Sequence, residues 1–197
     1  MGMNDGLLME PWIEEQLNVY EFVGFWKRVL INIIDSLILI LPTYTLTRIS
    51  VSAAESAGSA FPLFIQFALL MVFNIFMVVR YGGTPGRLLL GARIVDENGR
   101  YPVLRQALIR DSFIIVNSFL AVIVSLNTEA LSAIPSSLVN WSPLAADINV
   151  FLGWVVVVDC LFIAFTPRKR ALHDLMARTY VVNKTALERD QTGKFIA

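Results

Sequence analysis

Four apolar stretches recur along the chain, and the segments between them are polar, basic or rich in small residues. They cover residues 29–49, 60–79, 112–126 and 148–165. A hydrocarbon core of about 30 Å is crossed by about 20 mostly apolar residues in helical form, so the pattern predicts four transmembrane helices. The third stretch is short and carries Asn117 and three serines, and a re-entrant segment is the alternative interpretation of it.

The composition supports a membrane protein. Of the 197 residues, 56% are hydrophobic and 16% are charged, which is too apolar for an ordinary water-soluble domain. The formal net charge is zero, so nothing in the total charge suggests a nucleic-acid partner. The single cysteine, Cys160, excludes an intrachain disulfide, and the single histidine excludes a metal site built from a histidine cluster.

The basic residues are distributed very unevenly. Fifteen of the 16 Lys and Arg residues precede the first stretch, lie between the second and third, or follow the fourth. Only Arg48 falls on the other side of the predicted membrane. Because cytoplasmic flanks accumulate Lys and Arg, the pattern predicts an all-α membrane protein with both termini in the cytoplasm.

The polar segments predict a small cytoplasmic cap. Two β-like runs, ARIV at 92–95 and YPV at 101–103, flank an Asn98-Gly99 turn signal and predict a β-hairpin. The run RTYVV at 178–182 is a candidate third strand. The cap would cover residues 80–111 and 166–183.

The two ends of the chain are treated separately from the membrane domain. Residues 11–26 mix aromatic and acidic side chains, which fits either an interfacial helix or a polar lead-in with aromatic anchors. The predicted organisation is a cytoplasmic lead-in at 1–22, one four-helix membrane domain with its cap at 23–183, and a cytoplasmic tail at 184–197.

Two carboxylates, Asp35 and Asp159, lie inside predicted spans. Inserting an ionisable side chain there costs roughly 2.5–3.5 kcal/mol on insertion scales, so such a residue is expected to have a charged or polar partner or a functional role. Arg28, Asn32 and Asp35 share one helix face by their spacing. One hypothesis is that Asp35, Asp159 and Asn32 form a pocket for a cation, a proton or a small ligand. The other is that Asp35 neutralises Arg28 or a basic residue of the cap.

Nothing in the sequence predicts catalysis. His173-Asp174 resembles a general-base pair, but no Ser or Cys nucleophile with a supporting motif accompanies it. The glycines of GGTPG lack the order required for a phosphate-binding loop. We therefore expect no enzymatic activity, no cofactor and no metal centre.

Three segments together resemble the RDD family, which is named for one arginine and two aspartates. They are GFWKRVLINIIDSLIL, GGTPGRLLLGARIVDENGRYP and FTPRKRALHDLMARTYVV, and the resemblance covers about residues 23–183. It assigns the arginine to Arg28 and the aspartates to Asp35 and Asp174, and it leaves Asp159 outside the trio. It implies a small multi-pass protein of the bacterial inner membrane with a transport role.

Two functions follow as hypotheses. The first is a transporter or transporter subunit for a cation, a proton or a small ligand, which at this size would act as a homo-oligomer in the lipid bilayer. The second is a non-enzymatic scaffold that docks a membrane or cytoplasmic protein. In the scaffold, Arg28, Asp35 and Asp174, with His173 beside them, would form a structural clamp between the first span and the cap.

Overall fold

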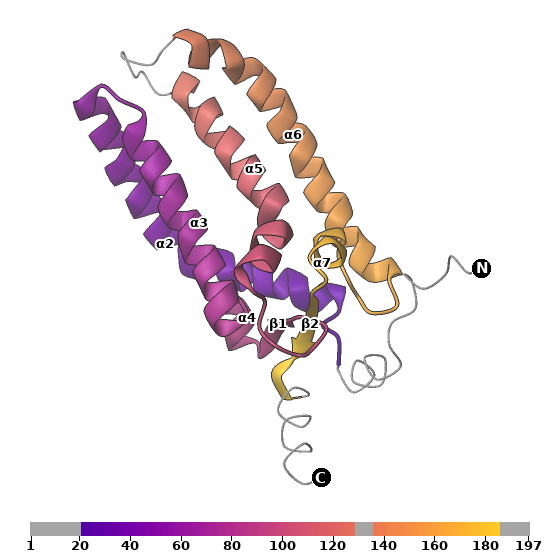
Figure 1. Cartoon of the computed structure of the whole chain (residues 1–197). Coiled ribbons are helices and arrows are strands. Elements are labelled where there is room, and N and C mark those ends of the chain that lie inside the picture. The colour runs from indigo at the N-terminus through magenta and orange to yellow at the C-terminus, as the bar shows by residue number, and fades with distance from the viewer. Residues whose placement is uncertain (1–20, 129–135, 186–197) are drawn as a thin grey trace, which may run out of the picture.

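The computed structural model describes residues 21–128 and 136–185 (Figure 1). Within these ranges, four helices are long and apolar enough to cross a membrane. They are α2 (Phe25–Ala57), α3 (Phe61–Tyr81), α5 (Leu104–Thr128) and α6 (Ser136–Phe165). Two short helices, α4 (Pro85–Leu89) and α7 (Leu172–Met176), and two strands, β1 (Ala92–Val95) and β2 (Tyr180–Asn183), complete the described fold. The predicted four-helix class with a small β element is confirmed.

The third membrane helix is longer than the apolar stretch that predicted it. Helix α5 begins at Leu104 rather than at residue 112. The side chain of Gln106 accepts a hydrogen bond from the backbone N–H of Val103 (3.1 Å) and so satisfies one donor at the start of the helix. Arg110 and Asp111 consequently lie within the helix, not in the cap.

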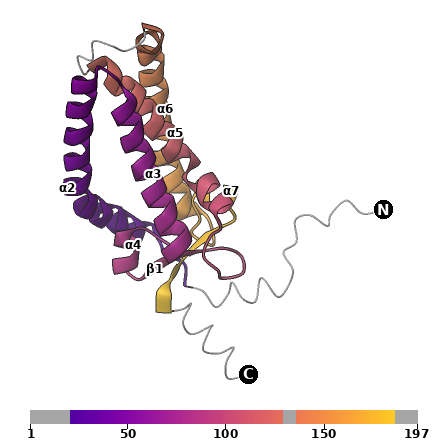
Figure 2. The ribbon, with the colours of Figure 1, turned by 60° about the vertical axis from the view of Figure 1, so that its left-hand side comes forward.

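Helix α2 is bent, and its amino-terminal part crosses the base of the bundle (Figure 2). Its 33 residues would span about 50 Å if straight, well beyond a hydrocarbon core of about 30 Å. Pro42 lies inside the helix and has no N–H to donate to the carbonyl one turn earlier, which is the usual cause of a kink. The bend brings the first turns of α2 against α4 and the sheet.

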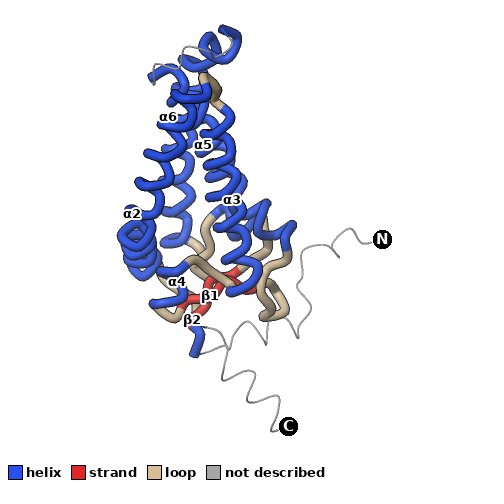
Figure 3. The backbone as a smooth tube through the Cα atoms, turned by 90° about the vertical axis from the view of Figure 1, so that its left-hand side faces the viewer, coloured by secondary structure: helices blue, strands red, loops and turns tan. Residues whose placement is uncertain are grey.

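The two strands pair with each other at one end of the bundle (Figure 3). β1 and β2 are antiparallel, with Ile94 opposite Val181, and Phe22 adds an isolated bridge to Val182. The predicted hairpin between residues 92–95 and 101–103 is therefore wrong, and the segment proposed as a third strand is the true partner of β1.

The side chain of Asp96 explains why the hairpin does not form. Its Oδ1 accepts hydrogen bonds from the backbone N–H groups of Asn98 (2.8 Å) and Arg100 (2.9 Å), which closes a tight loop. Pro102 has no backbone N–H to donate to a ladder, so the chain leaves the loop without forming a strand and enters α5.

Two clusters of buried apolar side chains hold the described helices together. One joins the sheet to the beginning of α2 and the end of α3, and it includes Ile31, Val78, Ile94 and Val181. The other joins the far ends of α2, α3 and α5 and consists of Ala54, Leu63 and Leu126. The outer faces of the long helices remain apolar and exposed, as expected for surfaces that contact lipid.

Part of the sequence predictions fall on residues that the structure does not describe. Residues 11–20 of the predicted interfacial helix lie outside the described ranges, and α2 itself begins at Phe25. Of the predicted tail at 184–197, only Lys184 and Thr185 are described.

Candidate functional site

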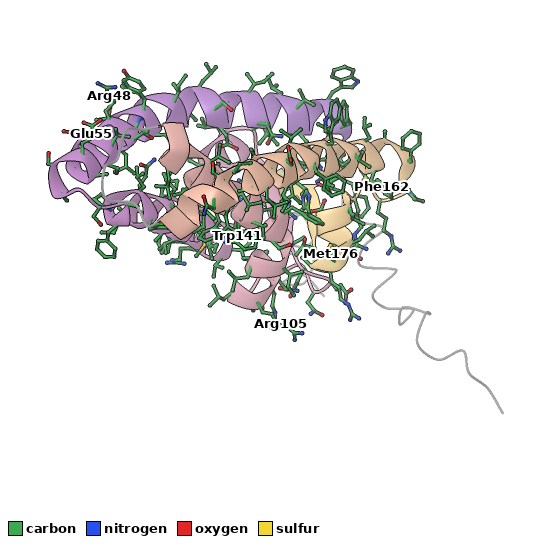
Figure 4. The ribbon with its side chains drawn as sticks, turned by 90° about the horizontal axis from the view of Figure 1, so that it is seen from above. Arg48, Glu55, Arg105, Trp141, Phe162 and Met176 are labelled. Atoms are coloured by element: carbon green, nitrogen blue, oxygen red, sulfur yellow. The ribbon has the colours of Figure 1, made fainter. Side chains whose placement is uncertain are left out.

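A buried ion cluster centred on Asp174 joins three helices beside the sheet. Arg28 Nη1 of α2 lies 2.6 Å from Asp174 Oδ2, and Arg110 Nη1 of α5 donates to Asp174 Oδ1. Asp174 is fully buried, and both arginines are nearly so. Arg105 lies on another face of α5 and is exposed, with its side chain pointing outward (Figure 4).

Local backbone geometry positions this carboxylate. Asp174 is the third residue of α7, where its Oδ2 accepts a hydrogen bond from the backbone N–H of Ala171 (3.1 Å) and caps the helix. Arg28 also donates to the carbonyl of Lys169 (2.7 Å), and Arg110 to the hydroxyl of Thr179 (3.0 Å). Each arginine therefore anchors both the carboxylate and the chain around α7.

The charges of the cluster decide the protonation state of Asp174. Burial alone would raise the pKa of its carboxyl, but Arg110 and Arg28 hold that pKa well below its ordinary value. The carboxylate is ionised at neutral pH, and a single aspartate holds the cationic side chains of α2 and α5 together.

His173 connects this cluster to α6. Its Nδ1 lies 2.5 Å from Asp159 Oδ2, and its Nε2 lies 3.3 Å from Asp174 Oδ1. The backbone N–H of His173 also donates to Asp159 Oδ1 (2.8 Å), so both oxygens of Asp159 are engaged by one residue. The ring of His173 therefore lies between the carboxylates of α6 and α7.

Asp35 makes a separate contact, with the start of α4. Its Oδ2 accepts a hydrogen bond from Thr84 Oγ1 (2.5 Å), and its Oδ1 accepts one from the backbone N–H of Gly86 (2.7 Å). A Cβ at Gly86 would lie 2.8 Å from the carbonyl oxygen of Ile31, so only glycine permits this approach of α4 to α2. Asp35 of α2 thereby binds the amino terminus of α4 across the interface between these two helices.

The shared pocket predicted for Asp35, Asp159 and Asn32 does not form. Asp35 is bound to α4, Asp159 is bound to His173, and Asn32 is exposed on the outer face of α2. The predicted contact between Arg28 and Asp35 is also wrong. A helical side chain leans toward the amino terminus, which takes Arg28 away from Asp35 and toward Val23, Lys169 and Asp174.

A cavity of about 440 Å³ lies elsewhere, between α2, α3 and α5. Its wall is mostly apolar, and neither Asp35 nor Asp159 belongs to it. The polar side chains that line it are Thr47, Gln66, Asn74, Asp111, Ser118 and Ser125.

Asp111 is the charged group of this cavity wall. It is 6% exposed, and its Oδ2 accepts a hydrogen bond from Asn74 Nδ2 (3.0 Å). Within the described part of the chain, no Lys, Arg or His nitrogen lies within 4.0 Å of its carboxylate oxygens. The neighbouring Arg110 is turned away, toward Asp174.

Residues 22–178 match the RDD family, which is most of the chain. The chain belongs to the RDD family. Together with its four candidate spans, this makes it an RDD-family multi-pass membrane protein. Searches of curated proteins and of solved structures found no match.

The three residues that the RDD resemblance singled out are not one contact. Arg28 and Asp174 form an ion pair, whereas Asp35 serves the amino terminus of α4. The second arginine of the cluster, Arg110, comes from α5 and was not among the candidates. In this RDD protein the cluster is therefore an aspartate between two arginines.

Sequence reasoning missed Asp111 because the third span was drawn from residue 112. A usable signal was present: Asp111, Ser118 and Ser125 recur every seven residues and share one helix face. On α3, Gln66 and Asn74 are two turns apart and also share a face. Both stripes line the cavity.

Proposed function

We propose that this RDD protein is a membrane transporter, or the transporting subunit of an oligomer, for a small cation that binds at Asp111. The observation that carries the proposal is a buried carboxylate facing an intramembrane cavity with one amide as its hydrogen-bond donor. Ionisable residues inside membrane helices are costly, and those that persist commonly serve ligand or ion pathways.

The other buried or half-buried carboxylates near the membrane helices are occupied. Among the described residues, Asp174 is shared by two arginines, Asp159 is held by His173, and Asp35 is held by α4. Asp111 differs because its donor is the amide of Asn74, whereas the charges of Arg110 and Arg87 act on it without a direct ion pair. A cation entering the cavity would form that pair.

We further propose the orientation and the membrane. The distribution of Lys and Arg favours both termini in the cytoplasm, with the protein in the bacterial inner membrane. Arg48 and Glu55 point outward from the other end of α2 (Figure 4). Asp111, about 10 Å from the start of α5, would then lie in the cytoplasmic half of the bilayer.

The proposed role is binding and translocation, not catalysis. Three helices surround the cavity, and a complete path across the bilayer would need a second copy of the chain or another membrane protein. For Asp35 and Asp159, first considered as cation ligands, we propose a role in packing instead, which their contacts with α4 and α7 support.

The test is flux in proteoliposomes that contain the full chain. Uptake of sodium, potassium, protons and a small organic ammonium ion would be measured for the wild type, for Asp111→Asn and for Asp147→Asn, a matched control on the exposed face of α6. We expect cation flux that Asp111→Asn abolishes and Asp147→Asn preserves. Flux that is equal in a well-folded Asp111→Asn protein would refute the role of Asp111.

A second function, a membrane scaffold, is favoured by the Asp174 cluster. Two arginines from separate membrane helices bind one aspartate of the cap, a geometry that would hold a docking surface in place. If the folded wild type transports neither inorganic nor organic cations, the scaffold becomes the better proposal. Its partner should then be recovered by cross-linking in membranes and lost when the cluster is broken.

A further inference from the structure

The cavity between α2, α3 and α5 is elongated along the helix axes. Its wall follows α5 from Asp111 to Ser125, which is about 21 Å at 1.5 Å per residue. The carboxylate stands at the end nearest the sheet, and apolar side chains such as Phe67, Leu70 and Val122 line the part beyond it. A ligand in this cavity would therefore meet the carboxyl group of Asp111 at one end and an apolar wall along its body.

A second polar contact lies farther along the same cavity. Gln66 donates from Nε2 to the hydroxyl of Thr47 (2.8 Å), which leaves the amide oxygen of Gln66 available to accept a hydrogen bond. Gln66 is two helical turns from Asn74, or about 12 Å along α3. The two polar ends enclose an apolar middle section.

Among the described residues, this arrangement is a poor fit for a hard divalent metal ion. Hard cations are bound by about six oxygen ligands in a compact shell. The described residues contain no group of three His, Cys, Asp or Glu side chains that could hold a metal ion. By contrast, about 440 Å³ falls within the usual range of about 300–1,000 Å³ for small-molecule pockets, whose walls are mostly apolar with a few polar groups.

We propose that the cavity binds a monovalent amphipathic organic cation, with its ammonium group on Asp111 and its hydrocarbon body between α3 and α5. This inference rests on the proposed function, whose cargo it specifies as an organic ammonium compound. The ammonium donates to Asp111, and the amide of Asn74 lines the cavity beside that carboxylate. The apolar body of the ligand replaces contact with water along the rest of the cavity. A hydroxyl at the far end of the ligand would reach Gln66.

The test uses phenylbutylammonium as the probe and phenylbutanol as its uncharged counterpart. Binding would be measured by equilibrium dialysis to the full chain in phosphatidylcholine nanodiscs, with empty nanodiscs subtracted to remove lipid partitioning. We expect the ammonium compound to bind about tenfold or more tightly than the alcohol, because a charge-assisted hydrogen bond is roughly twice as strong as a neutral one.

Two pairs of variants locate the binding site. Asp111→Asn should weaken binding of the ammonium compound about tenfold, while Asp147→Asn should leave it unchanged. Ser118→Leu fills the cavity and keeps the carboxylate, so it should also weaken binding, whereas Ser118→Ala adds no bulk and should not. The Ser118 pair keeps the test valid if Asp111→Asn fails to fold.

The outcomes separate this inference from the proposed function. Equal binding of the two probes, or binding that is indifferent to both Asp111→Asn and Ser118→Leu, would overturn the organic-cation site. Sodium or proton flux that requires Asp111, without binding of the ammonium probe, would also overturn it and leave transport standing. Binding of the probe without any flux would support the site and remove the transport proposal.

Discussion

Arg28 of α2 and Asp174 of α7 are 146 residues apart in the chain and form a buried ion pair, with Nη1 and Oδ2 separated by 2.6 Å. Arg110 of α5 donates to the other oxygen of the same carboxylate. One aspartate of α7 therefore links the first and third membrane helices to the segment that follows the fourth. None of these three residues lines the cavity between α2, α3 and α5.

Asp174→Asn should destabilise the protein strongly. The substitution leaves Arg28 and Arg110 buried without a counter-charge, a change that typically costs about 3–5 kcal/mol. Thermal unfolding in detergent, followed by circular dichroism, would measure the loss. Glu55→Gln, at an exposed position of α2, is the control and should unfold like the wild type. An unchanged melting temperature for Asp174→Asn would show that the cluster does not support the fold.

The stability of the protein should depend on pH below the ordinary range of aspartate. Because the folded pKa of Asp174 is depressed, its contribution is fully present above the unfolded pKa of about 3.9. That contribution is lost as pH falls through the folded pKa. Unfolding would be compared for the wild type and Asp174→Asn from about pH 7 to about pH 3. The difference between the two proteins should shrink in acid, and a constant difference would contradict the depressed pKa.

Gly86→Ala should weaken the packing of α4 on α2. The new Cβ would lie 2.8 Å from the carbonyl oxygen of Ile31 and 2.9 Å from Asp35, so the helices must separate. We expect a loss of about 1–3 kcal/mol, as in other overpacked sites. Gly153→Ala is the matched control, because its Cβ meets nothing within 4 Å and alanine favours the helix. Equal stability of the two variants would argue against the close approach.

Asp35→Asn should affect stability and leave cation binding nearly intact. Its oxygens hold Thr84 and the backbone of Gly86, and the amide retains one acceptor, so a loss of about 1 kcal/mol is expected. Probe binding in nanodiscs should match that of the wild type, in contrast to Asp111→Asn. If Asp35→Asn removes binding while its melting temperature is preserved, the ligand site lies at Asp35, as the sequence first suggested.

The cap shows how far local patterns reach. The runs at 92–95 and 178–182 contain β1 and most of β2, because β-branched and aromatic residues are a local strand signal. Their pairing is not local, since the hydrogen bonds of Asp96 close the loop that would have made the hairpin. A turn signal such as Asn98-Gly99 does not reveal which strand will follow it.

The candidate site was harder to predict than the spans. Asp35 and Asp159 were visible as charges in apolar stretches. The sequence could not show that the backbone N–H groups of Gly86 and His173 donate hydrogen bonds to them. Asp111 was hidden because the apolar run begins one residue after it, whereas the helix begins at Leu104. Hydropathy locates the apolar part of a membrane helix and does not locate polar turns that precede it.

The sequence alone determined the membrane class, the four spans and the RDD family, because the length and polarity of a span are properties of a continuous segment. The tertiary structure decided which carboxylates form ion pairs and which one lines the cavity. Asp174 and Asp111 differ through neighbours contributed by other helices. Among the described residues, Arg28 and Arg110 form ion pairs with the first, and the second accepts a hydrogen bond from the amide of Asn74 without an ion pair. Such contacts depend on how helices pack, and no local pattern along the chain encodes them.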